Sequence, residues 1–186
     1  MNHINIAHLF DVIETEEEFI LVLEWCSQDL AQVLKEETTN DEKFAKKIFF
    51  QLLQALNYCH SKMITHRDIK LENILLSGND TIKLADFGFS CKMPIGSFIK
   101  ESLGSFYSTA PEILKGESYN GTEIDAWSCG VALYRMLLGK YPFYFKPTDL
   151  HAIKRNNTFF KGNFEIPFFL NDDPEDLIVR LLDVNP

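Results

Sequence analysis

The sequence is poor in features that would assign it to several common classes. It has four cysteines among 186 residues, and none forms a CxxC pair or a His/Cys cluster with zinc spacing. We expect Cys26, Cys59, Cys91 and Cys129 to be reduced thiols of an intracellular protein. It has no basic run and a net charge of −9. A nucleic-acid or anionic-membrane surface needs positive charge, so neither is expected.

Targeting and membrane signals are also missing from the sequence. Residues 1–19 lack the basic start and long apolar core of a signal peptide. No uncharged apolar run approaches the ~20 residues of a membrane span. We therefore expect no membrane contact and a cytoplasmic location, with the nucleus left open. The hydrophobic content of 46% is enough for a sizeable core in one domain, or in one lobe of a larger one.

The patterns that are present predict strands first and helices afterwards. Residues 4–13 and 19–24 are apolar around an acidic turn, which predicts a hairpin. Residues 74–76 and 81–85 predict a second, shorter hairpin. Amphipathic spacing predicts helices over residues 41–62, 122–138, 148–156 and 173–184. Two hairpins followed by a mostly helical body make the predicted fold class α+β.

Helix boundaries and buried faces follow from the same patterns. Asn40 is the expected cap of the first helix, Gly139 ends the second, and Asp173 caps the last, with Pro174 in its first turn. The expected buried positions are Ile124, Trp127, Val131 and Tyr134 in the second helix, and Leu177, Leu181 and Leu182 in the last. Residues 89–110 have no clear period, so they predict a long loop, and a loop of that length in a compact domain is usually functional or disordered.

Three polar residues stand in apolar surroundings around the second hairpin. Asp68 and Asn73 precede its first strand, and Asp86 follows its second strand. The hairpin should return Asp86 to the side of Asn73, where a carboxylate and an amide oxygen suit Mg²⁺. Asp68 is placed to accept the proton of a hydroxyl group, and Lys70 adds positive charge for a phosphoryl group. Taken singly, a buried aspartate is more often a hydrogen-bonded structural residue than a base.

The ordered set of motifs is more specific than any single residue. H-R-D-x-K-x-x-N spans residues 66–73, DFG lies at 86–88, and A-P-E at 110–112 precedes a helix that opens IDAWSCG. On these motifs the chain resembles the eukaryotic protein kinase catalytic domain over essentially all its residues. Lys70, two positions after Asp68, resembles the serine/threonine type.

The resemblance implies an enzyme that transfers the γ-phosphoryl group of ATP to Ser or Thr of protein substrates. Asp68 would be the catalytic base, Asn73 and Asp86 the Mg²⁺ ligands, and Lys70 the contact to the γ-phosphate. Ser105 would tie Asp68 to Lys70.

The same resemblance implies where the nucleotide and the lobes lie. Residues 1–24 would be a remnant of the small lobe, 25–30 the hinge, and 31–186 the mainly helical large lobe. The residues implied to hold ATP are the gatekeeper Leu23, the hinge residues Glu24 and Cys26, Asp29 near the ribose, Leu75 under the adenine, and Asp86. The residues that match the stack running through the family's core are Leu9, His66, Phe87 and Asp125, with plain core packing as the alternative for Leu9 and Phe87.

Within the family, the motifs resemble the AMP-activated-kinase-like branch of the calmodulin-kinase group. Glu101 stands where that branch carries an activating phosphothreonine, so its carboxylate is predicted to pair with Arg67. A solvated loop glutamate is the alternative. Asp29 and Glu72 border the expected peptide groove and would favour basic substrate residues, with ribose contact and surface charge as alternatives. The SFYST segment (105–109) departs from the pattern of the branch, so the resemblance does not predict the shape of the substrate-docking surface.

The family's phosphate-binding elements do not occur in this sequence. It has no G-x-G-x-x-G, and the first lysine, Lys35, follows the hinge. The family's final helices, and the arginine that would pair with Glu112, are also missing. We therefore expect an incomplete kinase domain, which alone would have little or no kinase activity and weak nucleotide binding. As part of a longer chain, its motifs indicate an active kinase. The alternative function is a catalytically impaired, pseudokinase-like interaction or scaffold module.

Overall fold

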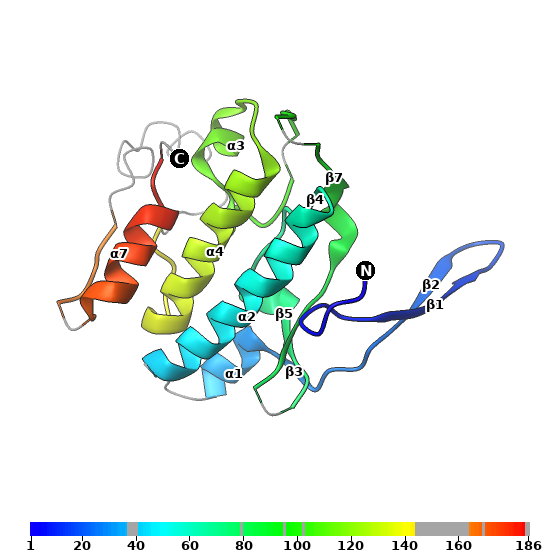
Figure 1. The fold of residues 1–186 in the computed structure, drawn as a ribbon, viewed down its shortest axis with the longest axis horizontal. Helices are drawn as coiled ribbons and strands as arrows, with labels where there is room; N and C mark the ends of the chain where they lie inside the picture. The colour runs from blue at the N-terminus through cyan, green and yellow to red at the C-terminus, as the bar shows by residue number, and fades with distance from the viewer. Residues whose placement is uncertain are drawn as a thin grey trace.

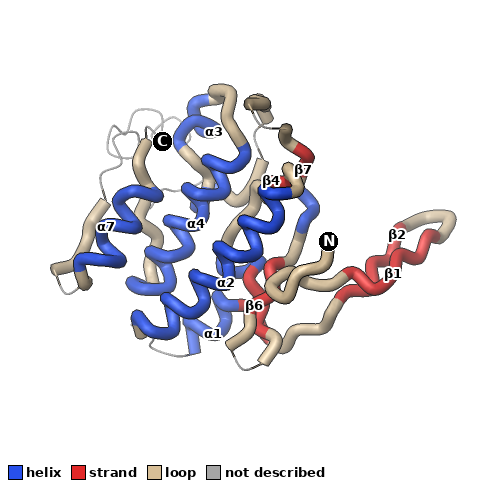
Figure 2. The backbone as a smooth tube through the Cα atoms, viewed as in Figure 1, coloured by secondary structure: helices blue, strands red, loops and turns tan. Residues whose placement is uncertain are grey.

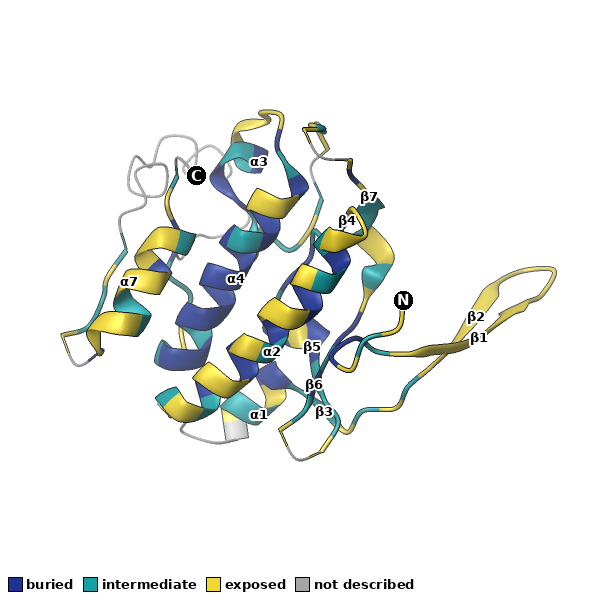
Figure 3. Ribbon diagram, in the orientation of Figure 1, coloured by how far each residue is buried: buried dark blue, intermediate teal, exposed yellow. Residues whose placement is uncertain are grey.

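One long, buried helix is at the centre of the body of the protein. The computed structural model describes residues 1–36, 41–78, 80–94, 96–101, 103–143, 164–168 and 170–184. Its helices are α1 (Leu30–Glu36), α2 (Glu42–Ser61), α3 (Pro111–Lys115), α4 (Gly121–Leu138) and α7 (Asp172–Leu181). α4 lies between α2 and α7 (Figure 1). It is buried along most of its length (Figure 3), so it is the core element on which the others pack.

The strands form three small antiparallel sheets. They are β1 (Leu9–Glu14) with β2 (Phe19–Leu23), β3 (Gln28–Asp29) with β5 (Ile74–Leu76) and β6 (Ile82–Leu84), and β4 (Ile64–Thr65) with β7 (Cys91–Lys92). The β1–β2 hairpin extends away from the helical body (Figure 2), and all its strand residues are exposed. The predicted α+β class, with a mainly helical body, is confirmed. None of the helices in the described residues has the length and apolar composition to cross a membrane.

Both predicted hairpins are present, and the first is shorter than expected. The second matches its prediction, with Ile74 opposite Leu84. In the first, β1 begins at Leu9, because the preceding residues dock on the body instead. The Asn5 amide donates to the carbonyl of Ile82 at 3.2 Å, and Ile6 forms a parallel bridge with Leu84.

The cap of α2 differs from the prediction. Asp41 Oδ1 accepts the backbone N–H groups of Lys43 at 2.8 Å and Phe44 at 3.2 Å, so Asp41 is the N-cap. Asn40 lies outside the described residues. At the end of α4, Gly139 has φ +67°, which confirms the predicted stop. The predicted buried face of α4 is confirmed as well.

The last helix begins and ends earlier than predicted, and its predicted buried face is confirmed in part, since Leu182 is 1% exposed and Leu181 packs against the core. Asn171 caps α7 in place of Asp173, and this start places three acidic residues in the first turn, where the helix dipole favours them. Ile178 is fully buried, whereas Leu177 is 37% exposed. At the other end of the helix, Leu181 and Leu182 approach Gly130 of α4 so closely that a Cβ there would lie 2.8 Å from Leu181 Cβ.

Two predicted segments between the helices have different outcomes. Residues 89–110 are largely irregular, as predicted, with β7 and the short 3₁₀ turn η3 (Phe106–Ser108) within them. The predicted helix at 148–156 lies outside the described residues. Residues 28–29 of the expected hinge form β3, which pairs with β5.

Candidate active site

The Asp68 carboxylate is the centre of a buried hydrogen-bond network. Asp68 follows β4 and is 2% exposed. Its Oδ2 accepts from Lys70 Nζ at 2.7 Å and from Asn73 Nδ2 at 3.0 Å, and its Oδ1 accepts from the Ser105 backbone N–H at 2.9 Å. Lys70 Nζ also donates to Ser105 Oγ at 2.9 Å. The structure therefore brings together the four residues predicted to be catalytic.

The network lowers the proton affinity of Asp68. Burial raises the pKa of this carboxyl group, but hydrogen bonds from Lys70, Ser105 and Asn73 outweigh burial, so the pKa lies below its ordinary value. The carboxylate is consequently ionised at neutral pH. An ionised, buried carboxylate is suited to orient a hydroxyl group and to accept its proton.

Asp125 in α4 fixes the backbone that carries Asp68. Its fully buried carboxylate accepts the N–H groups of His66 at 2.9 Å and Arg67 at 2.8 Å. Arg67 has φ +67°, a turn that carries both N–H groups toward the same side chain. The most buried of the described helices therefore determines the position of the segment that carries Asp68.

Gly104 is a functional residue that the sequence reasoning missed. It has φ +96°, and a Cβ there would lie 2.7 Å from the carbonyl oxygen of Arg67. Only glycine permits this conformation and this approach, and the approach lets Ser105 N–H reach Asp68. The available signal was a glycine beside a serine in an irregular segment.

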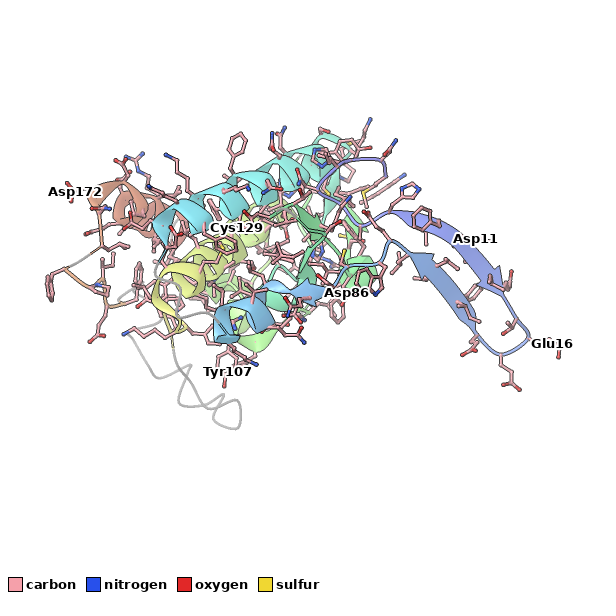
Figure 4. All side chains as sticks on the ribbon, turned by 90° about the horizontal axis from the view of Figure 1, so that it is seen from below. Asp11, Glu16, Asp86, Tyr107, Cys129 and Asp172 are labelled. Carbon is pink, nitrogen blue, oxygen red and sulfur yellow. The ribbon has the colours of Figure 1, made fainter. Side chains whose placement is uncertain are left out.

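The two predicted metal ligands flank the β5–β6 hairpin in sequence: Asn73 precedes β5 and Asp86 follows β6. Ala85 N–H donates to Asn73 C=O at 2.9 Å, which confirms that the hairpin returns the chain beside Asn73. Asp86 is exposed, so the expectation that it is embedded in apolar surroundings is wrong. Asp86 has φ +59°, and it lies near the point where the β1–β2 hairpin leaves the body (Figure 4).

These residues fit a magnesium ion by the chemistry of their donor atoms. The Asn73 nitrogen donates to Asp68 O and Oδ2, so its amide oxygen is the atom directed away from Asp68. That oxygen and the exposed Asp86 carboxylate are hard ligands, and Mg²⁺ takes few protein ligands and completes its shell with water and phosphate. Among the described residues, no group of three His, Cys, Asp or Glu side chains has metal-site geometry.

The residues predicted to hold the nucleotide are less buried than Asp68, and two of them, Glu24 and Asp29, already form contacts within the protein. Glu24 pairs with Lys83 Nζ at 2.8 Å, and its N–H donates to His8 C=O at 2.8 Å. Asp29 Oδ1 accepts the N–H of Gln32 at 2.8 Å at the start of α1. Leu23 is 48% exposed. The remaining two, Cys26 and Leu75, are half-buried.

Three of the four residues expected to stack in the core are linked. The rings of His66 and Phe87 lie 4.7 Å apart, and Asp125 holds the His66 backbone. Burial lowers the pKa of His66, which favours the neutral ring. Leu9 is 46% exposed on the hairpin, so neither the stack nor core packing describes it in this structure.

The predicted pair between Arg67 and Glu101 is present. Arg67 Nη1 lies 2.6 Å from Glu101 Oε2, with the arginine side chain 8% and the glutamate side chain 57% exposed. Arg67 Nε also donates to the Phe89 carbonyl at 2.6 Å. The arginine thus links the segment that carries Asp68 to two points of the long loop. Glu101 is nevertheless more than half exposed, so the hypothesis that this pair orders the loop stays a prediction.

The comparison with known families decides the identity of this fold. The model of the protein kinase domain matches residues 1–186, which is the whole chain. The chain belongs to the protein kinase domain family. Carbon catabolite-derepressing protein kinases of Candida glabrata and Saccharomyces cerevisiae are each 39% identical to this kinase domain over all its residues. Sucrose non-fermenting protein kinase 1 of Fusarium virguliforme is 40% identical.

These relatives are much longer than the kinase chain described here. The chain covers 30%, 29% and 26% of the three proteins, respectively. The matches confirm the resemblance to protein kinases of the AMP-activated and sucrose non-fermenting branch.

Proposed function

We propose that this kinase domain transfers the γ-phosphoryl group of ATP to serine or threonine hydroxyl groups of protein substrates. The observation that carries the proposal is the buried Asp68 carboxylate, which Lys70, Asn73 and the Ser105 N–H hold in place. A lysine two residues after the base, bonded to a serine hydroxyl, supports the serine/threonine type.

Each residue of the network has a distinct role in this proposal. Asp68 orients the acceptor hydroxyl and takes its proton as the oxygen attacks phosphorus. Lys70 stabilises negative charge on the transferring group. Asn73 and Asp86 would hold Mg²⁺, which supplies charge neutralisation for the phosphates when bound with ATP.

The finer prediction concerns a preference for basic substrate residues near the acceptor. Asp29 and Glu72 were the basis for expecting basic residues near the acceptor. Asp29 accepts a hydrogen bond at the start of α1, and Glu72 pairs with Arg135 at 3.1 Å. A carboxylate that already has a partner attracts basic side chains less strongly. A basic context stays a prediction for a peptide array to test, and the pairing of Glu72 with Arg135 argues against it at positions near Glu72.

The direct test is phosphoryl transfer by the full-length protein with ATP and Mg²⁺. Phosphorylation of serine or threonine in protein substrates is expected. Transfer only to tyrosine would contradict the serine/threonine assignment. A protein that shows no Mg²⁺-dependent shift in thermal unfolding with ATP, and no transfer, would instead match the scaffold alternative.

A further inference from the structure

A cavity beside Asp68 is lined in part by Arg135, a charged residue that has no role in the proposed proton transfer. The cavity has a volume of about 260 Å³. Lys70 and Ser105 line it on the side of Asp68, and Tyr107, Arg135 and Tyr141 line it further out. Because Lys70 and Ser105 also contact Asp68, a substrate whose hydroxyl reaches Asp68 would place a neighbouring side chain in or near this cavity.

Aromatic rings make the outer wall of the cavity rigid. Tyr107 stacks on Tyr141, with ring centroids 4.7 Å apart and planes 28° apart. Phe106 meets Tyr107 edge-on at 5.4 Å. Tyr107 extends from the lower side of the body in Figure 4, away from Asp86. This wall comes from the SFYST segment, whose sequence departs from the branch.

Arg135 is fixed against this wall. It comes from α4, and its guanidinium carbon lies 4.3 Å from the centroid of the Tyr141 ring. Its side chain is only 15% exposed. A guanidinium group that stacks on an aromatic ring loses little further freedom when it forms an ion pair.

Glu72 is the acidic residue of the cavity lining, and Arg135 neutralises it. Arg135 Nη1 lies 3.1 Å from Glu72 Oε1 and 3.3 Å from Oε2. Glu72 is 43% exposed in its side chain, so substrate can approach it. An exposed carboxylate without a partner would attract a basic side chain, whereas a paired one presents little net charge.

We propose that Arg135 is a specificity-determining residue of the kinase domain. By pairing with Glu72, it makes this cavity select an uncharged substrate side chain near the acceptor and removes selection for arginine or lysine. The inference rests on the proposed kinase activity. Glu72 would favour basic residues only where Arg135 does not pair with it. Specificity is a difference in affinity between competing substrates, and this pair removes the advantage of a basic one.

The test is a peptide library in which each position around one serine is varied, phosphorylated by the full-length protein. The original protein should show no preference for basic residues at any position that depends on Glu72. Arg135→Gln should raise the rate for peptides with arginine or lysine at one position by about 2- to 5-fold. Glu72→Gln should produce a similar preference for aspartate or glutamate at the same position.

The controls separate the charge effect from loss of structure. Exchange of the two residues, Glu72→Arg with Arg135→Glu, should return the selectivity toward that of the original protein. Asp176→Asn, which removes the partner of Arg180 on the distant helix α7, should change nothing. Transfer with the same selectivity in all variants would contradict this inference alone. Transfer to no peptide by the original protein would contradict the proposed function.

Discussion

The acceptor side and the nucleotide side of the candidate active site are built in different ways. On the acceptor side, Asp68 is 2% exposed and receives three hydrogen bonds, and its backbone is anchored by Asp125 in the core helix α4. On the nucleotide side, Asp86 and Leu23 are exposed. The packing of the helical body therefore preorganises the groups that handle the hydroxyl.

Contacts differ between the two sides for a physical reason. Asp68 follows β4, and Asp125 of the buried helix α4 holds the backbone just before it, whereas Leu23 ends a hairpin whose residues are all exposed. A two-stranded hairpin has little apolar surface to bury by itself. We infer that changes on the acceptor side affect folding and activity together, while changes on the nucleotide side affect activity alone.

The largest effect that separates the two sides is expected from Asp86→Asn. Asparagine tolerates the left-handed backbone of this position, and the side chain is exposed, so the free energy of unfolding should change by less than about 0.5 kcal/mol. Phosphoryl transfer should fall by about 10²- to 10³-fold, because a group that neutralises phosphate charge is lost. Denaturant unfolding and transfer rates of the full-length protein measure both. Strong destabilisation would show that the nucleotide side is also structural.

A smaller loss of activity, with loss of stability, is expected from Gly104→Ala. The Cβ meets the Arg67 carbonyl, and the positive φ is strained, so stability should fall by about 1–3 kcal/mol. Displacement of the Ser105 N–H should lower transfer about 10- to 100-fold. Gly116→Ala is the matched control, since Gly116 has φ +76° and open space around its Cβ. Equal effects of both changes on transfer would contradict the role of Gly104.

Glu101→Ala should have a more modest effect. The carboxylate is more than half exposed, and such ion pairs contribute about 0.2–1 kcal/mol, so transfer should fall by about 1.5- to 5-fold. Glu101→Thr should behave like Glu101→Ala until it is phosphorylated, and phosphorylation should restore the pair with Arg67. Glu16→Ala, at the hairpin turn (Figure 4), is the control. Unchanged activity in Glu101→Ala would show that the pair does not order the loop.

The smallest expected effect is the pH dependence of stability. Because the folded-state pKa of Asp68 is lowered, its network stabilises the protein above about pH 4, the ordinary value for aspartate. That contribution disappears as the pH falls through the lowered folded-state pKa. The difference in unfolding free energy between the original protein and Asp68→Asn should therefore be constant near neutrality and shrink in acid. A difference that grows in acid would contradict the sign of the shift.

The sequence predicts the acceptor side better than the nucleotide side. Asp68, Lys70, Asn73 and Ser105 occur in ordered motifs, and their contacts match the prediction. Asp86 was expected in apolar surroundings because of its neighbours in sequence, and Leu9 was expected in the core because of the family resemblance. Both are exposed, because exposure depends on what packs over a residue. Gly104 was missed because its role depends on a contact with Arg67, which lies 37 positions earlier.

Helix boundaries show the same limit on a smaller scale. Asn40 and Asp41 are both good capping residues, and only backbone geometry shows that Asp41 accepts the N–H groups of α2. Ile178 is buried and Leu177 is exposed, a difference that depends on how α7 packs on α4. Local pattern predicts the existence of these elements, and tertiary contacts decide their ends and their rotation.

The central claim is that a preorganised Asp68 carboxylate, held independently of the nucleotide, performs the proton transfer. The most direct measurement is single-turnover phosphoryl transfer by the full-length Asp68→Asn protein, with Mg²⁺-dependent ATP binding measured on the same sample. We predict unchanged binding and transfer slowed by about 10²- to 10⁴-fold. Transfer at the original rate with unchanged binding would contradict the claim.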